Sequence, residues 1–257
     1  MNFMGYRRPD GRVGIRNKVL ILPTCVCSSE TCRIVAEQVE GSIYVSNQAG
    51  CSEVEQNLKI CYDMYSGFAA NPNIYATVLI GLGCEGCTPE EMKKAIEAKT
   101  NKPLEVVVIQ DEGGTVNAIN KAVKAARKFV QEASLVKKEE CPISDLYVAL
   151  ECGGSDATSG LAANPVVGKT SDIVVDLGGS AIMSETTEFI GAEHILAKRA
   201  ATPEIKKQII GICRDLEEHL ANVNQNLRTG QPTPGNKEGG ISTIEEKSLG
   251  CIYKGGT

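Results

Sequence analysis

The sequence predicts an α/β protein built from two Rossmann-like parallel-sheet units with flanking helices. Short aliphatic runs recur along the chain, and each is followed by a loop rich in Gly, Ser or Cys and then by apolar residues at helical spacing. Strands that are apolar throughout and alternate with helices are typical of parallel sheets covered on both faces. A length of 257 residues suits two modest domains.

The first α/β unit is expected over residues 1–136. It opens with a hairpin in 5–17, because the Pro-Asp-Gly sequence at 9–11 is a turn signal. Its strands are expected at 18–24, 42–46, 76–83 and 104–110. Its helices are expected at 31–40, 53–70, 90–99 and 116–133.

A second α/β unit is expected over 145–227, after the charged link at 137–142. Its strands are expected at 145–151 and 180–184, and its helices at 188–199 and 203–227. The remaining tail, 228–257, is rich in Gly, Pro, Ser and Thr. We therefore expect the tail to be loop-like and to be an incomplete end of the domain.

Composition excludes several classes of partner. The formal net charge is −5, from 27 basic and 32 acidic residues, so the chain has no cationic field for a phosphate backbone. Aromatic residues make up only 4% and Trp is absent, which argues against stacking on single strands. The sequence contains no apolar run long enough to cross a bilayer and no signal-peptide pattern at Met1. We expect a cytoplasmic chain that contacts neither nucleic acid nor membrane.

Eleven cysteines, an odd number, do not read as a disulfide framework in such a chain. Their positions are informative, because several follow the ends of predicted strands, where ligands bind in open parallel sheets. A metal or reactive-thiol site at this edge is the preferred interpretation, and small buried filler is the alternative. The four cysteines chosen as metal ligands are Cys27, Cys51, Cys84 and Cys152.

Thiolate ligands favour iron, iron–sulfur clusters, zinc or copper(I). The Cys84–Cys87 pair has no second CxxC at zinc-ribbon spacing, so a structural zinc site is disfavoured. Iron, as Fe²⁺ or as an iron–sulfur cluster, is the predicted cofactor, with Mn²⁺ as an alternative ion. No Gly-rich loop matches a dinucleotide fingerprint or a P-loop, so a nucleotide site is not supported.

Five segments in the same order resemble the altronate/galactarate dehydratase family, which also includes the large subunit of sulfolactate sulfo-lyase. The segments are 5–17 (GYRRPDGRVGIRN), 81–85 (GLGCE), 151–168 (ECGGSDATSGLAANPVVG), 184–200 (SETTEFIGAEHILAKRA) and 236–250 (NKEGGISTIEEKSLG). The resemblance implies a lyase, usually iron-dependent, that eliminates water from a hydroxylated sugar acid, or a sulfo-lyase subunit that eliminates sulfite. The alternatives are a thiol-rich metal-binding domain without catalysis and an oxidoreductase that uses a dinucleotide.

Two departures from the family pattern stand out. The family commonly has a His four residues before the Cys of the second loop, and this sequence has Asn47 there, ahead of Cys51. The family also has a small domain before the matched region and a further segment after it. The resemblance therefore implies a small partner subunit or domain, a missing C-terminal segment beyond Thr257 and an oligomeric assembly.

Elimination from a 2,3-dihydroxy acid removes a weakly acidic proton at C2 while the C3 hydroxyl leaves, so it needs a base, groups that bind the hydroxyls, and cations. We assign Lys247 as the candidate base, with a solvated lysine as the alternative. Ser155 and Asp156 are candidate catalytic groups. The expected substrate contacts are Arg12 and Arg16, as carboxylate clamps unless they form a solvated edge, and Asn164, at a substrate hydroxyl.

Overall fold

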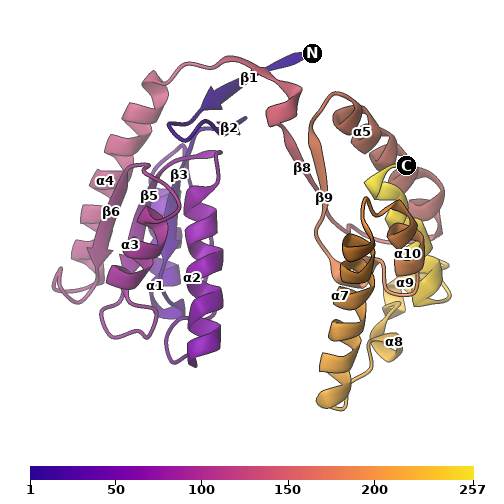
Figure 1. The fold of residues 1–257 in the computed structure, drawn as a ribbon. Helices are drawn as coiled ribbons and strands as arrows, with labels where there is room; N and C mark the ends of the chain where they lie inside the picture. Colours follow the sequence, from indigo (N-terminus) through magenta and orange to yellow (C-terminus); the bar gives the residue numbers. More distant parts are fainter. The chain divides into compact units, whose positions relative to one another are not determined.

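The computed structural model describes all residues 1–257. Contacts divide the chain into two compact units, one of residues 2–141 and the other of residues 142–257 with Met1. Figure 1 labels most of the helices and strands of both units. Each unit is described below by itself.

The first unit has a four-stranded, all-parallel sheet, as predicted. Its strands in sheet order are β4 (Ser42–Tyr44), β3 (Lys18–Pro23), β5 (Ile74–Gly81) and β6 (Leu104–Val108). The two central strands consist almost wholly of buried aliphatic residues. A strand that is apolar on both faces requires cover on both faces.

Four helices supply that cover: α1 (Val26–Glu37), α2 (Glu55–Ala70), α3 (Pro89–Glu97) and α4 (Thr115–Leu135). Val19 and Ile21 of β3 pack in one core cluster with residues of α1 and α4. Leu20 and Leu22 pack in a second cluster with residues of α2 and α3. Successive side chains of a strand point to opposite faces, so each face of the sheet has its own helix pair (Figure 1).

The strand order reverses between β3 and β5. From β3 the chain adds β4 on one side, then returns across the sheet to add β5 and β6 on the other. In open parallel sheets, ligands bind beyond the carboxyl ends of the strands at such a reversal. The segments there are the loop and first helical turn at 24–27 and the loops at 45–54 and 82–88, which include three of the cysteines chosen from the sequence.

A separate small sheet has the order β2-β1-β7, formed by β1 (Asn2–Arg7), β2 (Val13–Gly14) and β7 (Glu139–Pro142). Strands β1 and β2 pair antiparallel, with Tyr6 opposite Gly14. This pairing confirms the hairpin predicted at 5–17.

The second unit is α/β but has a smaller sheet than expected. Only two strands, β8 (Tyr147–Leu150) and β9 (Ser180–Met183), pair in it, in parallel. The connection between them is a π turn (Ser159–Ala163) that continues into α5 (Asn164–Asp176). Two further helices follow, the short α6 (Glu193–Leu196) and α7 (Pro203–Asn222). The α/β class is confirmed, whereas a full Rossmann-like sheet is not present in this unit.

The prediction of a loop-like tail was wrong. The tail contains α8 (Leu227–Gly230), α9 (Pro234–Glu238), α10 (Ile244–Ile252) and a final 3₁₀ turn (Tyr253–Gly255). Thr243 caps α10, because its hydroxyl oxygen accepts a hydrogen bond from the Glu246 N–H at 3.1 Å. Ile244 and Ile252 are buried in the core of the second unit with Phe189 and Ile190. The tail packs on a core supplied by residues far earlier in the chain.

The longest helices of the structure, α4 with 21 residues and α7 with 20, are both amphipathic. Ala118, Ala122 and Phe129 of α4 are buried against the sheet, while its lysines lie on the outer side. None of the helices combines the length and the apolar character that a membrane span requires.

Candidate active site

A small polar pocket of about 50 Å³ lies in the second unit, between the loop that follows β8 and helix α10. Four residues selected from the sequence line it: Ser155, Asp156, Asn164 and Lys247. The structure thus brings together residues that lie more than eighty positions apart in the sequence. The other lining residues are Ala157, Ser159, Gly160, Ile241, Glu246, Gly250 and Cys251.

Asp156 shapes the loop beside the pocket. Its Oδ1 accepts hydrogen bonds from the backbone N–H groups of Thr158 at 2.8 Å and Ser159 at 2.9 Å, and from both hydroxyls. The Thr158 hydroxyl, 2.6 Å away, is the main cause of a lowered pKa for Asp156. The carboxylate is therefore an ionised acceptor that starts the helical turn, as an Asx cap does. This arrangement favours a positioning role for Asp156 over proton transfer.

Lys247 lies on α10 and is half-buried. Its Nζ donates to Asn236 Oδ1 at 3.1 Å and to Gln231 Oε1 at 3.2 Å, and both acceptors are neutral amides. Asn236 Nδ2 in turn donates to the backbone oxygen of Ser155 at 2.9 Å. These two hydrogen bonds fix the amine at the pocket wall, and neither of them is to a carboxylate.

Asn164 closes the opposite side of the pocket at the start of α5. Its Nδ2 donates to the backbone oxygen of Gly250 at 3.0 Å. A Cβ at Gly250 would lie 3.2 Å from the Cα of Gly160, so α10 and the π turn meet through two glycines. Close approach of the backbones keeps the pocket narrow.

A candidate metal-binding set adjoins this pocket. One ligand atom from each of Cys152, Glu185 and Glu188 lies within 4.8 Å of the others. Cys152 follows β8 and both glutamates follow β9, so the parallel pairing of these strands brings the three together. Cys152 Sγ is also 3.3 Å from Ser155 Oγ, which links the set to the pocket.

Glu188 carries the strongest sign that a cation belongs here. It is 3% exposed and pairs through Oε1 with the buried Lys254, whereas its buried Oε2 has no hydrogen-bond partner. Burial lowers the pKa of Lys254, but Glu188, together with Cys251 and Cys152, outweighs burial and leaves the pKa raised, so Lys254 is a cation. A buried carboxylate oxygen without a donor fits a bound metal ion. One thiolate and two carboxylates suit divalent iron, manganese or zinc.

Sequence reasoning missed Glu185 and Glu188, because it followed the cysteines alone. The signal was present in the sequence. The segment 184–188 (SETTE) follows a predicted strand, as does the loop that carries Cys152. Carboxylates at the ends of parallel strands merit the same attention as thiols at those ends.

The other predicted ligands, Cys27, Cys51 and Cys84, lie in the first unit and are exposed at the carboxyl ends of its strands. Among residues 1–257, only Cys152 and the two glutamates bring three ligand atoms within 4.8 Å of one another. The structure therefore groups Cys152 with two carboxylates, and the other three predicted ligands belong to the first unit.

Arg12 and Arg16 lie near the other end of the first unit's parallel sheet, where its strands begin. The Arg16 N–H donates to Asn73 Oδ1 at 3.0 Å, and Asn73 directly precedes β5. The Arg12 guanidinium forms two bonds with Asp10 Oδ2, at 2.6 and 2.9 Å. The structure does not bring these arginines to the cysteine edge of the sheet, and their role as carboxylate clamps stays a prediction.

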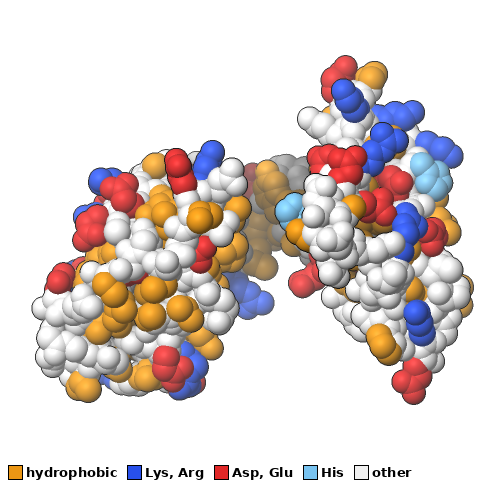
Figure 2. Space-filling view, turned by 90° about the horizontal axis from the view of Figure 1, so that it is seen from below, with side chains coloured by type: hydrophobic (Ala, Val, Ile, Leu, Met, Phe, Trp, Pro, Cys, Tyr) orange, Lys and Arg blue, Asp and Glu red, His pale blue; other side chains and the backbone are white.

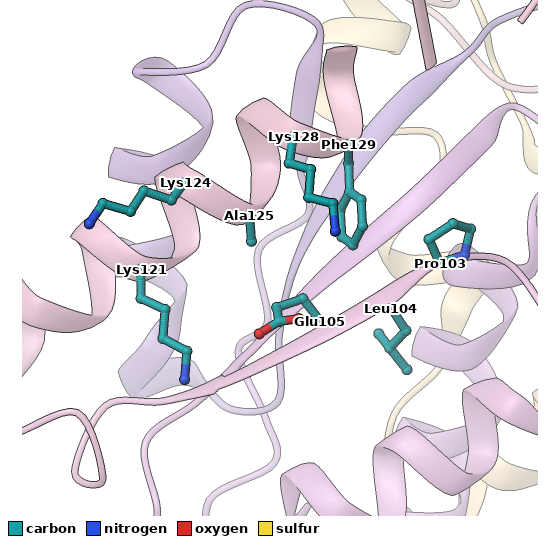
Figure 3. Close-up of a pocket in the computed structure, with 8 residues that line it drawn as sticks. All are labelled: Pro103, Leu104, Glu105, Lys121, Lys124, Ala125, Lys128 and Phe129. Carbon is teal, nitrogen blue, oxygen red and sulfur yellow. The ribbon is translucent and has the colours of Figure 1, made fainter. Parts of the chain in front are cut away.

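A larger hollow of about 500 Å³ lies between β6 and α4 in the first unit. Three lysines of α4, Lys121, Lys124 and Lys128, line it together with Glu105 of β6, and Figure 3 shows the Lys124 side chain directed away from Glu105. Lys121 already pairs with Glu112 at 2.5 Å. The hollow contains none of the predicted site residues and no set of metal ligands, so the smaller pocket of the second unit remains the candidate active site.

Comparison with family models gives two matches that together span most of the chain. The model described as "D-galactarate dehydratase/Altronate hydrolase, second domain" matches residues 5–134. The model described as "D-galactarate/Altronate dehydratase, C-terminal" matches residues 143–257, which include the whole pocket and the Cys152, Glu185 and Glu188 set.

Curated proteins give similar chains of greater length. The (2R)-sulfolactate sulfo-lyase subunit beta of Chromohalobacter salexigens is 36% identical over 258 residues, covering 98% of this chain and 64% of that protein. Altronate dehydratase of Bacillus subtilis is 35% identical over 267 residues, covering 99% and 52%. Galactarate dehydratase (L-threo-forming) of Escherichia coli is 32% identical over 273 residues, also covering 99% and 52%. The chain thus spans about half to two thirds of the length of these relatives.

Proposed function

Because this chain belongs to the D-galactarate/altronate dehydratase family, we propose that it supplies the active site of a lyase that eliminates water from a hydroxylated sugar acid. The family membership confirms the resemblance inferred from the five motifs. The observation that carries the proposal is the single pocket lined by Ser155, Asp156, Asn164 and Lys247 beside the Cys152, Glu185 and Glu188 set.

The pocket provides the groups that the elimination needs. Lys247 is the group that takes the proton from C2, because its amine is held at the pocket wall by the side-chain oxygens of Gln231 and Asn236. Ser155 Oγ and Asn164 hold substrate hydroxyls. Asp156 keeps the loop in register, and its charge disfavours the approach of a carboxylate from that side.

Cys152, Glu185 and Glu188 would hold the divalent metal, and we propose iron(II), with manganese(II) as the alternative. A bound divalent ion acts as a Lewis acid on a departing hydroxyl and neutralises charge that develops on the substrate. The Lys254 ammonium, buried beside Glu188, adds a second positive charge near the carboxylates. This charge offsets the two glutamates and makes the neighbourhood less repulsive to an acidic substrate.

The length and names of the relatives bear on the composition of the whole enzyme. The relatives are longer, and one of them is named as a subunit beta. We propose that activity requires a small partner subunit or domain, a further C-terminal segment and an oligomeric assembly in the cytoplasm.

Sulfite elimination is the second candidate function. One relative, at 36% identity, is named a sulfolactate sulfo-lyase subunit, and the chain covers more of it than of the altronate dehydratase of B. subtilis. The chemistry is closely related, since a proton next to a carboxylate is removed and a group leaves the neighbouring carbon. The identity of the leaving group separates the two candidates.

The test is anaerobic turnover with ferrous iron, with galactarate, altronate and sulfolactate as substrates and 2-keto acid or sulfite as the measured product. The assays use this chain together with candidate partner chains. We expect Lys247→Met to lower kcat by about 10²-fold or more. Lys237→Met, an exposed lysine on the neighbouring α9, is the matched control and should retain activity. Full activity of Lys247→Met would remove Lys247 from the mechanism, and a metal-loaded assembly inert on all three acids would favour a non-catalytic domain.

A further inference from the structure

Three cysteines of the first unit are exposed, although cysteine is among the residue types most often buried. Cys27, Cys51 and Cys84 are open to solvent. The other cysteines of this unit are buried and fill the hydrophobic core or its margin: Cys25, Cys32, Cys61, Cys87 and Cys141. Packing explains the buried thiols and does not explain the exposed ones. We call Cys27, Cys51 and Cys84 the thiol rim.

Backbone hydrogen bonds tie the three loops of the thiol rim together. The Val26 N–H donates to the Ala49 oxygen at 3.0 Å, which joins the first loop to the second. The Gly86 N–H donates to the Cys51 oxygen at 2.8 Å, and the Cys87 N–H donates to the Gly50 oxygen at 2.8 Å, which join the second loop to the third. The three exposed thiols therefore belong to one connected edge of the sheet.

Two buried polar side chains fix these loops further. Glu85 accepts hydrogen bonds from the Thr24 hydroxyl at 2.5 Å, from the Leu82 N–H at 2.9 Å and from the Gly83 N–H at 2.6 Å. Burial raises the pKa of Glu85, but these bonds outweigh burial and lower it. Asn47 is fully buried and donates to the Thr24 oxygen at 2.9 Å. Such fixed loops preorganise the thiols for a ligand.

The amino-terminal end of helix α1 lies at this edge. Helix α1 begins at Val26, its N-cap residue Cys25 makes no side-chain capping bond, and the first turn has no acidic residue. Cys27 lies in that first turn, near the positive end of the helix dipole.

The face of the first unit seen in Figure 2 also carries many hydrophobic side chains, and the colour for this class includes cysteine. Two apolar residues next to the rim loops, Val26 and Val54, are 40% and 67% exposed.

The spacing of the thiols argues against a single ion. Zinc–sulfur bonds of about 2.3 Å keep the sulfurs bound to one ion within about 4.6 Å of one another. The sulfurs of Cys27, Cys51 and Cys84 do not form a set within 4.8 Å, unlike the ligand atoms around Cys152. An iron–sulfur cluster binds each cysteine to a different iron and so spreads its ligands more widely.

We infer that Cys27, Cys51 and Cys84 together bind an iron–sulfur cluster through three thiolates, which leaves one iron without a protein ligand. Each thiol loses its proton as its sulfur binds iron, and the iron and the inorganic sulfide come from outside the chain. The site lies wholly in the first unit. The inference does not rest on the Cys152, Glu185 and Glu188 set of the proposed function.

The experiment is anaerobic reconstitution of the full chain with ferrous iron, sulfide and a thiol reductant. Iron and acid-labile sulfide per chain, visible absorption and the electron paramagnetic resonance spectrum of the reduced protein are then measured. We expect Cys27→Ser, Cys51→Ser and Cys84→Ser each to lose the chromophore and most of the sulfide. Cys152→Ser is the matched control, because it removes a partly exposed thiol of the second unit, and it should keep the full sulfide content.

Acid-labile sulfide separates this inference from the proposed function, since an ion held by Cys152 and two glutamates contributes iron without sulfide. Wild-type protein that takes up no sulfide overturns the inference. So does stoichiometric zinc held by the rim, or an equal loss of sulfide in Cys152→Ser, which would mean one site shared by all four cysteines. Melting temperatures of the variants must match that of the wild type, so that loss of sulfide reports ligation, and a rim variant that melts early is remade with Ala at the same position.

Discussion

Lys102 is a buried amine in the first unit. It is 9% exposed, and its Nζ donates to the backbone oxygens of Asn71 at 2.6 Å and Ile74 at 3.0 Å. Burial, reinforced by the charges of Arg8 and Arg12, lowers the pKa of Lys102 to about 7. Folding therefore places a titration near neutral pH at the end of the sheet where the strands begin.

This shift predicts how stability depends on pH. Between about pH 7 and pH 10 the unfolded chain keeps a proton that the folded chain has released, so the free energy of unfolding rises with pH by up to about 1.4 kcal/mol per unit. Below pH 7 both the folded and the unfolded chain keep this proton, so the free energy of unfolding no longer changes with pH through Lys102. Lys102→Met should flatten the rise, as measured by urea unfolding at several pH values. Lys124→Met, which removes an exposed charge on α4, serves as the control, and an identical rise in Lys102→Met would contradict the prediction.

The buried pair of Glu188 and Lys254 gives a second prediction at this scale. Both side chains are under 6% exposed, so removing one partner leaves an uncompensated buried charge. Lys254→Met and Glu188→Gln should each lower the free energy of unfolding by about 3–5 kcal/mol, and the double variant Lys254→Met with Glu188→Met should cost less than the sum. Arg33→Met, which breaks only exposed ion pairs, is the control and should change the free energy of unfolding far less than either buried substitution. Additive effects in the double variant would show that the two side chains do not act as a pair.

At the scale of elements, the central strands could be predicted because a strand that is buried on both faces consists of consecutive aliphatic residues, as in 18–24. Helix α10 was missed for the opposite reason. Its surroundings are rich in Gly and Ser, and its few apolar residues bury themselves against a core made by Phe189 and Ile190. The capping pattern Thr243 to Glu246 was a local signal that composition obscured.

The candidate site shows the same division. Ser155, Asp156, Asn164 and Lys247 were identified from motifs, and the structure shows that they share one pocket. The sequence could not show that Asp156 is occupied in holding its own loop, because that depends on backbone N–H groups whose direction only the fold defines.

Two glycines make a matched pair of predictions for the loops and helices of the first unit. Gly50 has a φ of +88°, and a Cβ there would lie 2.2 Å from the Thr24 oxygen. Gly50→Ala should therefore destabilise the unit and separate the loops of the thiol rim. Gly67 lies inside α2 with nothing within 4 Å of an added Cβ, so Gly67→Ala should stabilise by about 0.5–1 kcal/mol. Urea unfolding of both variants measures the contrast, and changes of the same sign would contradict it.

At the scale of the whole molecule, the relatives set the expectation for activity. The chain matches 98–99% of its own length to proteins of which it covers 52–64%. The pocket described above lies entirely within the matched region.

We expect this chain alone to turn over hydroxy acids negligibly. Turnover should appear when the parts of a relative that this chain does not match are supplied as separate chains. The comparison is of initial rates of 2-keto acid or sulfite formation, anaerobically, with ferrous iron and with or without the added chains. Lys247→Met in the reconstituted mixture is the control that ties the gained activity to this pocket. Robust turnover by the lone chain would show that the site is complete without them.

The contacts between α10 and the loop that follows β8 have a consequence for biosynthesis. Chains emerge from the ribosome from the amino end, and domains generally fold as units as they appear. The sheet of the first unit is complete once residue 108 has emerged, whereas the pocket has no second wall until α10, at Ile244–Ile252, follows some ninety residues after Ser155. A nascent chain therefore carries a folded first unit while the pocket lined by Ser155 and Lys247 is still unassembled, and a ribosome that stalls before α10 leaves a product without the proposed site.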